Sequence, residues 1–437
     1  MAFRTLITQS MDQSNSPHSD LRQRLERLGV TRGMPGKPKP PPKPETRDQA
    51  TGIEAVIDGE LVNTPLGGCF VTEEARPADD THGNITLSAI HTHGDGTLAA
   101  IAQDDQLHQF DPEAAAFIDI ETSGLAGGTG TFAFLVGVGF FDGPTFRVRQ
   151  FFMRDPSEEP AVIHLLDDLL QNFEAVVSFN GKAFDVPLLD TRFILWRRRF
   201  PLKNAPHLDL LAPARRLWKE RLSSCSLTSL EEHILGIFRE GDVPGWLIPA
   251  LYFEYEKTGN ARPLKPVFTH NALDILSMVS LTAHMARRFV EPETAGVKHG
   301  ADWYSLGRCY ETLGWADQAE GAYRQALSAP CALTIRQRAL ENLSFLYKRR
   351  SMWDRATEIW QDLINAGLTD RLYPYEELAK YYEHQQREHA PAIQLVREAV
   401  RRIQERDLWP RRPRHRALSE LRHRLARLER KAGRVGQ

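Results

Sequence analysis

The stretch AAAFIDIET, residues 114–122, decides the fold of this chain. It is a nearly continuous apolar run, which is typical of a strand that is buried on both faces in the middle of a sheet. The runs FAFLVGVGFF (132–141) and TFRVRQFFM (145–153) follow, and the turn signal Asp-Gly-Pro separates them. We therefore expect three consecutive strands that form a meander.

The residues that follow this meander alternate between helical and strand patterns. Apolar residues recur at helical spacing in 158–173, AVVSFNG (175–181) has the pattern of a strand, and helical patterns return in 182–198 and 266–289. Strands that alternate with helices predict an α/β domain with a mixed sheet and flanking helices, over residues 113–291.

The chain on either side of this domain has a different character. Repeated prolines and lysines predict a disordered segment over residues 1–50, and short apolar runs predict a small β-rich extension over 51–112. Residues 298–437 contain only helical patterns, and their large and small residues recur in three copies, the first two of them 37 residues apart. The first copy includes WYSLGRCY (303–310), which resembles the opening of a tetratricopeptide (TPR) repeat, so we expect a TPR-like domain that ends in a basic helix.

The composition excludes several classes of protein. The chain has 437 residues, with 55 Lys and Arg against 57 Asp and Glu, so its formal net charge of −2 excludes a uniformly basic protein. No stretch approaches the roughly 18 apolar residues that a membrane helix needs. No signal-peptide core is present at the N-terminus, and the four cysteines are scattered. We expect a cytoplasmic protein without a membrane segment.

Asp119 and Glu121 are the first candidates for chemistry. Residues i and i+2 of a strand point to the same face, so both carboxylates project together at the end of the first strand. Two like charges that close are costly unless a cation neutralises them.

Three further polar side chains join this pair. Asp185 begins the helix that follows the strand at 175–181, and His270 and Asp274 lie one helical turn apart on the last long helix. Four carboxylates offer hard oxygen ligands, which suit two divalent cations, Mg²⁺ or Mn²⁺. Such a pair of ions hydrolyses phosphodiester bonds, and His270 would take the proton of the attacking water or orient that water.

The segments FIDIETSGL (117–125), FNGKAFDVPLL (179–189) and HNALDIL (270–276) resemble, in order and context, the three motifs of the DEDD exonucleases. The subgroup that fits best is the YprB-type, or mitomycin repair factor B-like, nucleases, which also carry TPR-like helices. The resemblance implies a ribonuclease H-like fold and cleavage of nucleic acid from 3′ ends. It also implies that the metal ligands are Asp119, Glu121, Asp185 and Asp274, and that His270 is the catalytic histidine.

The spacing of the third motif departs from the usual pattern. Most histidine-type members place one more residue between His and Asp, and the H-x3-D spacing found here matches the tyrosine-type subgroup. The motif spacing therefore supports the assignment of His270 as the base less strongly than it supports the four carboxylates as metal ligands.

Several residues are candidates for contact with nucleic acid. Within the motifs these are Thr122, Ser123, Gly124, Leu125, Asn180 and Phe184. Arg197, Arg198 and Arg199 follow the helix of Asp185, and we expect them to contact phosphate. From 397 to 434 there are 14 Lys and Arg against 5 Asp and Glu; this run is either a nucleic-acid surface or a solvated face.

The segment 241–259, GDVPGWLIPALYFEYEKTG, either lines a substrate channel or plugs the fold.

Two functions from different classes fit these observations. The first is a metal-dependent 3′–5′ exonuclease that acts on DNA, single-stranded or at 3′ ends, with RNA as an alternative substrate. The family resemblance implies a role in DNA repair, with a helicase or another repair protein bound through the TPR-like module. The second is a non-catalytic scaffold that binds nucleic acid or protein and retains a vestigial nuclease fold.

Overall fold

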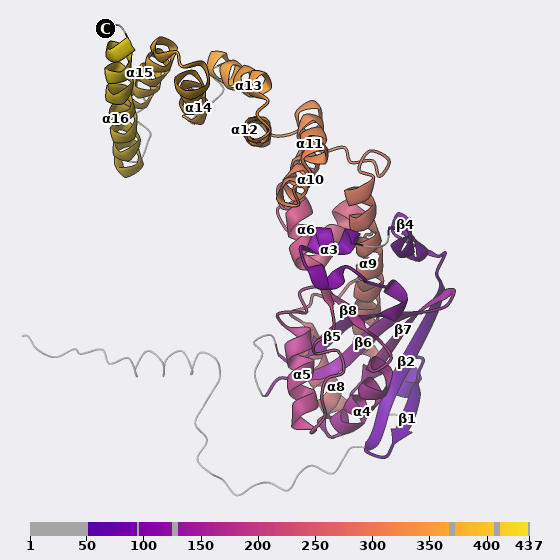
Figure 1. Cartoon of the computed structure of the whole chain (residues 1–437). Coiled ribbons are helices and arrows are strands. Elements are labelled where there is room, and N and C mark those ends of the chain that lie inside the picture. Colours follow the sequence, from indigo (N-terminus) through magenta and orange to yellow (C-terminus); the bar gives the residue numbers. More distant parts are fainter. Residues whose placement is uncertain (1–50, 94–95, 125–129, 367–371, 406–410, 436–437) are drawn as a thin grey trace, which may run out of the picture. The chain divides into compact units, whose positions relative to one another are not determined.

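The computed structural model describes residues 51–93, 96–124, 130–366, 372–405 and 411–435 (Figure 1). The segment 1–50, which we predict to be disordered, lies outside these residues. Within the described part of the chain, no helix is both long enough and apolar enough to cross a membrane.

In the part of the chain that the structure describes, nine strands form a large sheet and a short hairpin. They are β1 (Glu60–Thr64), β2 (Gly67–Pro77), β3 (Thr81–His82), β4 (Ile85–Thr86), β5 (Ala115–Thr122), β6 (Ala133–Asp142), β7 (Thr145–Phe152), β8 (Ala175–Ser178) and β9 (His207–Asp209). The order in the large sheet is β1-β2-β7-β6-β5-β8-β9, and β3 pairs only with β4. β5–β8 and β8–β9 are parallel and the other neighbours are antiparallel, so the sheet is mixed, as predicted.

The helices follow the strands in the expected order. In the first part of the chain they are α2 (Ile53–Val56), α3 (Thr97–Ala102), α4 (Glu159–Leu170), α5 (Asp185–Leu195), α6 (Leu211–Trp218), α7 (Leu227–Leu230), α8 (Ile248–Thr258) and α9 (Lys265–Val290). The later helices are α10 (Gly300–Thr312), α11 (Ala316–Ser328), α12 (Leu333–Arg349), α13 (Trp353–Asn365), α14 (Tyr373–Tyr381), α15 (His389–Glu405) and α16 (Arg411–Val435).

The meander predicted from three apolar runs is present as β5, β6 and β7. Nine consecutive residues of β6, from Ala133 to Phe141, are buried because helices cover both faces of the sheet. Residues of α4, α5 and α8 pack in the core on one face, and residues of α3, α6 and α9 pack on the other. A side chain at Gly137 or Gly139 of β6 would collide with residues of α9, so these glycines let α9 lie directly against the sheet.

The predicted β-rich extension adds to this same sheet. β2 pairs with β7 over eight residue pairs, from Phe70–Phe152 to Pro77–Thr145, and β1 pairs with β2 at the edge. β1 and β2 therefore enlarge the central sheet, whereas β3 and β4 form a separate hairpin.

The C-terminal region consists of helices, as predicted. The three sequence copies coincide with the helix pairs α10/α11, α12/α13 and α14/α15. Large residues pack against small ones: a Cβ at Gly307 of α10 would lie 2.7 Å from the ring of Tyr323 on α11. Each copy is thus one helical hairpin.

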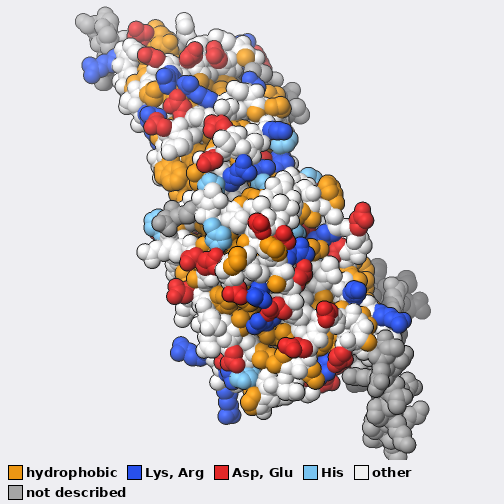
Figure 2. Space-filling model, turned by 90° about the vertical axis from the view of Figure 1, so that its right-hand side faces the viewer, with side chains coloured by type: hydrophobic (Ala, Val, Ile, Leu, Met, Phe, Trp, Pro, Cys, Tyr) orange, Lys and Arg blue, Asp and Glu red, His pale blue; other side chains and the backbone are white. Residues whose placement is uncertain are grey.

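Part of the basic C-terminal run has a structural role. Arg424, Arg427 and Lys431 of α16 form ion pairs with Glu383, whose side chain is fully buried in the turn after α14. These cations hold α16 against the preceding helices. On the face shown in Figure 2, basic and acidic side chains are interspersed, in keeping with the near-zero net charge.

Candidate active site

The first two carboxylates lie at the carboxyl end of the central strand. Asp119 and Glu121 continue the row of Ala115 and Phe117 on one face of β5, the face against which α9 packs. The ladder between β5 and β6 becomes irregular after Glu121, where β5 ends. The local pattern of the strand alone therefore places both side chains on one face, as predicted.

Asp185 reaches the same edge of the sheet from β8. β8 runs parallel to β5, with Phe117 opposite Val177, so the two carboxyl ends lie together. The turn after β8 is fixed by Asp209, which accepts hydrogen bonds from the backbone N–H of Asn180 (2.8 Å) and Lys182 (3.1 Å). This turn delivers Asp185 to the first position of α5.

His270 and Asp274 complete the set from α9. His270 Nε2 lies 3.7 Å from Asp274 Oδ2, as expected for side chains one turn apart. Both side chains are mostly buried, with exposed fractions of 15% and 17%.

Electrostatics shows that the four carboxylates share one site. Burial, followed by the negative charges of the other three, raises the pKa of Asp119 well above its ordinary range. The pKa of Glu121 is also raised well above its ordinary range, mainly by burial and then by the negative charges of Asp274 and Asp185. Burial, followed by Asp209 and Asp274, raises the pKa of Asp185 to about 7. The pKa values of Asp119, Glu121 and Asp185 are raised in part by carboxylates from other elements, Asp274 among them, so the fold brings these four side chains close together.

The chemistry of this donor set fits divalent cations. Hard carboxylate oxygens are the ligands that Mg²⁺ and Mn²⁺ prefer, and the raised pKa values of Asp119 and Glu121 reflect the cost of burying carboxylates close together, which a bound cation would offset. Among the described residues, no three His, Cys, Asp or Glu side chains stand in the geometry of a completed metal site. The argument for metal therefore rests on the donor types and their mutual repulsion.

Three residues that the sequence analysis did not single out surround His270 and Asp274. Asp242 Oδ1 lies 2.7 Å from His270 Nδ1, and Arg239 Nη2 donates to Asp274 Oδ1 at 2.5 Å. Arg239 also pairs with Glu231, and both side chains are at most 4% exposed. Asp242 holds Nδ1 of His270, so Nε2 is the ring nitrogen that faces Asp274.

These residues lack a local sequence signal. They lie between residues 231 and 242, in a π-helical turn (Glu231–Leu235) and an irregular connection before α8, where no periodicity points to an interior face. Asp242 falls within the segment 241–259 that we interpreted as channel lining or a plug. Ile248 and Tyr252 are buried in the core, which agrees with the plug, and Asp242 contacts His270; lining of a substrate channel stays a prediction.

The residues predicted to contact nucleic acid within the motifs lie at the end of β5 and just before α5. Thr122 Oγ1 donates to the Gly124 carbonyl (2.9 Å), and Ser123 Oγ accepts the backbone N–H of Phe132 (3.1 Å). Phe184 directly precedes Asp185 and is 56% exposed. Leu125 lies outside the described residues.

The predicted arginine cluster stands at the other end of α5. Helix α5 has 11 residues and begins at Asp185, so Arg197–Arg199 lie roughly 18 Å farther along its axis. Arg198 pairs with Asp167 of α4, and Arg197 and Arg199 are exposed. Arg198 thus helps to join two helices, and contact of this cluster with nucleic acid remains a prediction.

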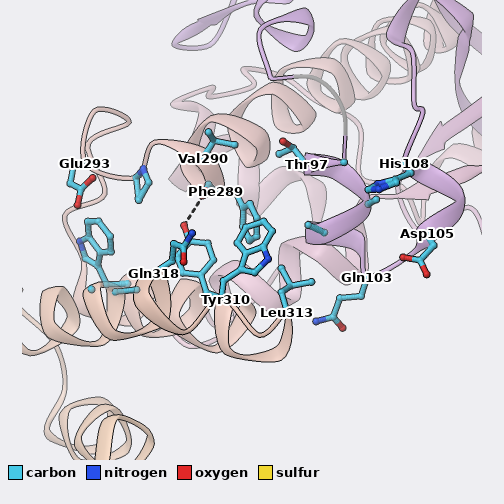
Figure 3. A pocket seen from close by; sticks show the side chains of 18 residues that line it. Thr97, Gln103, Asp105, His108, Phe289, Val290, Glu293, Tyr310, Leu313 and Gln318 are labelled. Atoms are coloured by element: carbon cyan, nitrogen blue, oxygen red, sulfur yellow. Dashed lines mark hydrogen bonds between the residues drawn. The ribbon is translucent and has the colours of Figure 1, made fainter. Parts of the chain in front are cut away.

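A separate apolar cavity of about 670 Å³ lies away from these residues (Figure 3). Its walls come from α3, the end of α9, α10 and α11, and Figure 3 shows Phe289 and Tyr310 at its centre. Tyr310 Oη donates to the Phe289 carbonyl at 2.6 Å. The cavity contains none of the predicted site residues.

Comparison with known proteins identifies relatives of the chain. Residues 116–286 match the RNase H superfamily. The uncharacterized protein YprB of Bacillus subtilis (strain 168) is 31% identical over 340 residues, which are 76% of this chain and 80% of YprB. A family B DNA polymerase from the hyperthermophilic archaeon Pyrobaculum calidifontis aligns with a TM-score of 0.32 and 14% identity, over 56% of this chain and 34% of the polymerase. That structural likeness is too low to support an argument about either chain.

Proposed function

Because the chain belongs to the family of YprB and contains an RNase H-like domain, we propose that it is a metal-dependent 3′–5′ exonuclease that hydrolyses the phosphodiester bonds of DNA. The observation that carries this proposal is the group of four carboxylates from β5, α5 and α9, whose burial and mutual repulsion raise the pKa values of Asp119, Glu121 and Asp185. Bound divalent cations would offset the cost of ionising these buried carboxylates side by side.

The side chains of the site would have three roles in hydrolysis: metal binding, proton transfer and positioning of a metal ligand. Asp119, Glu121, Asp185 and Asp274 would hold two divalent cations, which when bound supply an activated water and stabilise the leaving oxygen. His270 would accept a proton through Nε2, because Asp242 holds Nδ1. Arg239 fixes one oxygen of Asp274 and leaves Oδ2 on the side of His270.

The direction and setting of the reaction follow from the family resemblance. The DEDD motifs imply cleavage from 3′ ends, and the YprB-type resemblance implies a role in DNA repair. The exposed ring of Phe184 beside Asp185 suits stacking on an unpaired base, which favours a single-stranded 3′ end. The helical hairpins α10–α15, which we interpret as TPR-like, would bind a helicase or another repair protein.

The second candidate is a non-catalytic scaffold built on the same fold. It predicts that the acidic residues have lost their function and have been neutralised. The uncompensated charge at Asp119 and Glu121 favours the enzyme instead.

An assay with labelled substrates separates the two. We expect the purified protein to shorten 5′-labelled single-stranded DNA progressively with Mn²⁺ or Mg²⁺, and to leave it intact with EDTA. Double-stranded DNA and RNA of the same sequence measure the substrate preference. Asp185→Asn should remove the activity, whereas Asp190→Asn, on the same helix but paired with Lys203, should keep it. If no substrate is shortened in a metal-dependent way, the scaffold is the better account.

A further inference from the structure

The strands before residue 112 are connected to the carboxylate site by buried side chains. Two chains of hydrogen bonds cross the interior, one from β2 and one from the β3–β4 hairpin. The first ends on Asp119 and the second ends on Asp274, which come from different elements of the site.

The first series of hydrogen bonds begins at Thr72 on β2. Thr72 Oγ1 donates to Gln150 Oε1 on β7 (3.0 Å), and Gln150 Nε2 donates to Asn271 Oδ1 on α9 (2.8 Å). Asn271 Nδ2 then donates to Asp119 Oδ2 (2.7 Å). Thr72, Gln150 and Asn271 are 8%, 5% and 0% exposed, so water does not replace these partners.

The orientation of both amides in this chain is determined. Gln150 Nε2 also donates to the Phe268 carbonyl (2.8 Å), which is an acceptor only, so Oε1 must face Thr72. Asn271 must then turn its oxygen to Gln150 and its NH₂ to Asp119. With Oδ2 of Asp119 held, the other oxygen is free for a cation.

The second series of hydrogen bonds begins at His82 in the β3–β4 hairpin. His82 Nε2 lies 2.8 Å from Ser277 Oγ, Ser277 donates to Glu231, and Arg239 links Glu231 to Asp274. Because the Ser277 hydroxyl gives its proton to Glu231, Nε2 of His82 is the donor to Ser277 Oγ. Burial lowers the pKa of His82 to about 4, so the ring is neutral at pH 7. The hairpin is seated closely, because a Cβ at Gly83 (φ 71°) would lie 2.5 Å from the Leu235 carbonyl.

We propose that the segment 67–86, β2 to β4, is a positioning element of the active site, and that through Thr72 and His82 it sets the orientation of the metal-binding carboxylates Asp119 and Asp274. This inference rests on the proposed function, since it assigns to these residues the orientation of the metal ligands. Thr72 and His82 are positioning residues because each acts through other side chains.

The decisive variants change one hydroxyl group. Thr72→Val keeps the shape of the side chain and removes the donor to Gln150, whereas Thr72→Ser keeps the donor. Val71→Ala is the matched control: it lies next to Thr72 on the same strand, but its side chain packs in the core on the opposite face. It should lower the unfolding temperature without reaching Asp119.

Three measurements on the full chain test the proposal: kcat on labelled single-stranded DNA, the affinity for Mn²⁺ from the electron paramagnetic resonance signal of the free ion, and the unfolding temperature. We expect Thr72→Val to lower kcat and Mn²⁺ affinity by about 5- to 10-fold, at the weaker end of the effects of residues behind metal ligands. Thr72→Ser should restore both values, and Val71→Ala should change neither.

Wild-type kcat and Mn²⁺ affinity in Thr72→Val would overturn the proposal, as would equal losses in Val71→Ala. Failure of the proposed function would look different. A wild-type protein that binds Mn²⁺ but cleaves no nucleic acid refutes the exonuclease, and the Mn²⁺ affinities of the three variants still decide the positioning role. If the wild type binds no Mn²⁺, both proposals fail.

Discussion

Buried acidic side chains occur in two regions of this molecule, and the regions treat them differently. In the helical region, burial would raise the pKa of Glu383, but Lys431 and Arg427 outweigh it and the pKa falls below its ordinary value. In the sheet domain, burial and neighbouring carboxylates raise the pKa values of Asp119 and Glu121. The protein pairs Glu383 with three cations, whereas in the proposed metal site Arg239 pairs with Asp274 and, among the described residues, Asp119 and Glu121 form no ion pair.

Neutralising a site carboxylate should give the largest effect on activity. Asp119→Asn keeps the shape of the side chain and removes a metal ligand, so we expect kcat to fall by at least about a thousandfold. The free energy of unfolding of the metal-free protein should stay the same or rise, because a repulsive charge is gone. Exonuclease assays and urea denaturation with EDTA measure the two effects. A marked loss of stability would show that Asp119 is structural.

Removing the proposed base should rank second. His270→Ala is expected to lower kcat by about a hundredfold or more, the usual range for a positioned general base. The affinity for Mn²⁺ should change little, since the four carboxylates remain. Loss of Mn²⁺ binding comparable to that of Asp119→Asn would make His270 a ligand and refute its role as the base.

The opposite pattern is expected in the helical region. Glu383→Gln leaves Arg424, Arg427 and Lys431 without their shared partner, so the free energy of unfolding should fall by about 1–3 kcal/mol. Exonuclease activity on a short single-stranded substrate should be that of the wild type. If this variant lost activity while it stayed folded, the division between structural and functional carboxylates would be wrong.

Two buried histidines, His82 and His284, are kept neutral by burial. Burial lowers the pKa values of His82 and His284 to about 4, below the ordinary value near 6.5. Between these two values the unfolded chain binds more protons, so stability falls as pH drops from about 6.5 toward 4. We expect roughly 1–2 kcal/mol per histidine to be lost by pH 5. His82→Gln should make denaturation at pH 7, 6 and 5 less dependent on pH, and an unchanged pH dependence would mean that His82 is not buried and neutral.

The sequence predicted the parts of the site that depend on local geometry. Asp119 and Glu121 share a face because of strand periodicity, and His270 and Asp274 do so because of the helical turn. The sheet brought Asp185 to the same edge because β5 and β8 are parallel.

The residues that hold these groups in place could not be predicted. Asn271, Gln150 and Arg239 contact partners between 35 and 152 positions away, and neither periodicity nor composition records such pairings. The partner of Arg198 could not be predicted either: the fold pairs it with Asp167 of α4, and its contact with phosphate stays a prediction.

A calorimetric titration of Mn²⁺ into the metal-free protein tests the central claim most directly. The account predicts that the wild-type chain binds two Mn²⁺ ions, that Asp119→Asn and Asp274→Asn lose this binding, and that Glu383→Gln keeps it. A wild-type chain that binds no Mn²⁺, or Asp119→Asn and Asp274→Asn variants that bind it as well as the wild type does, would contradict the account.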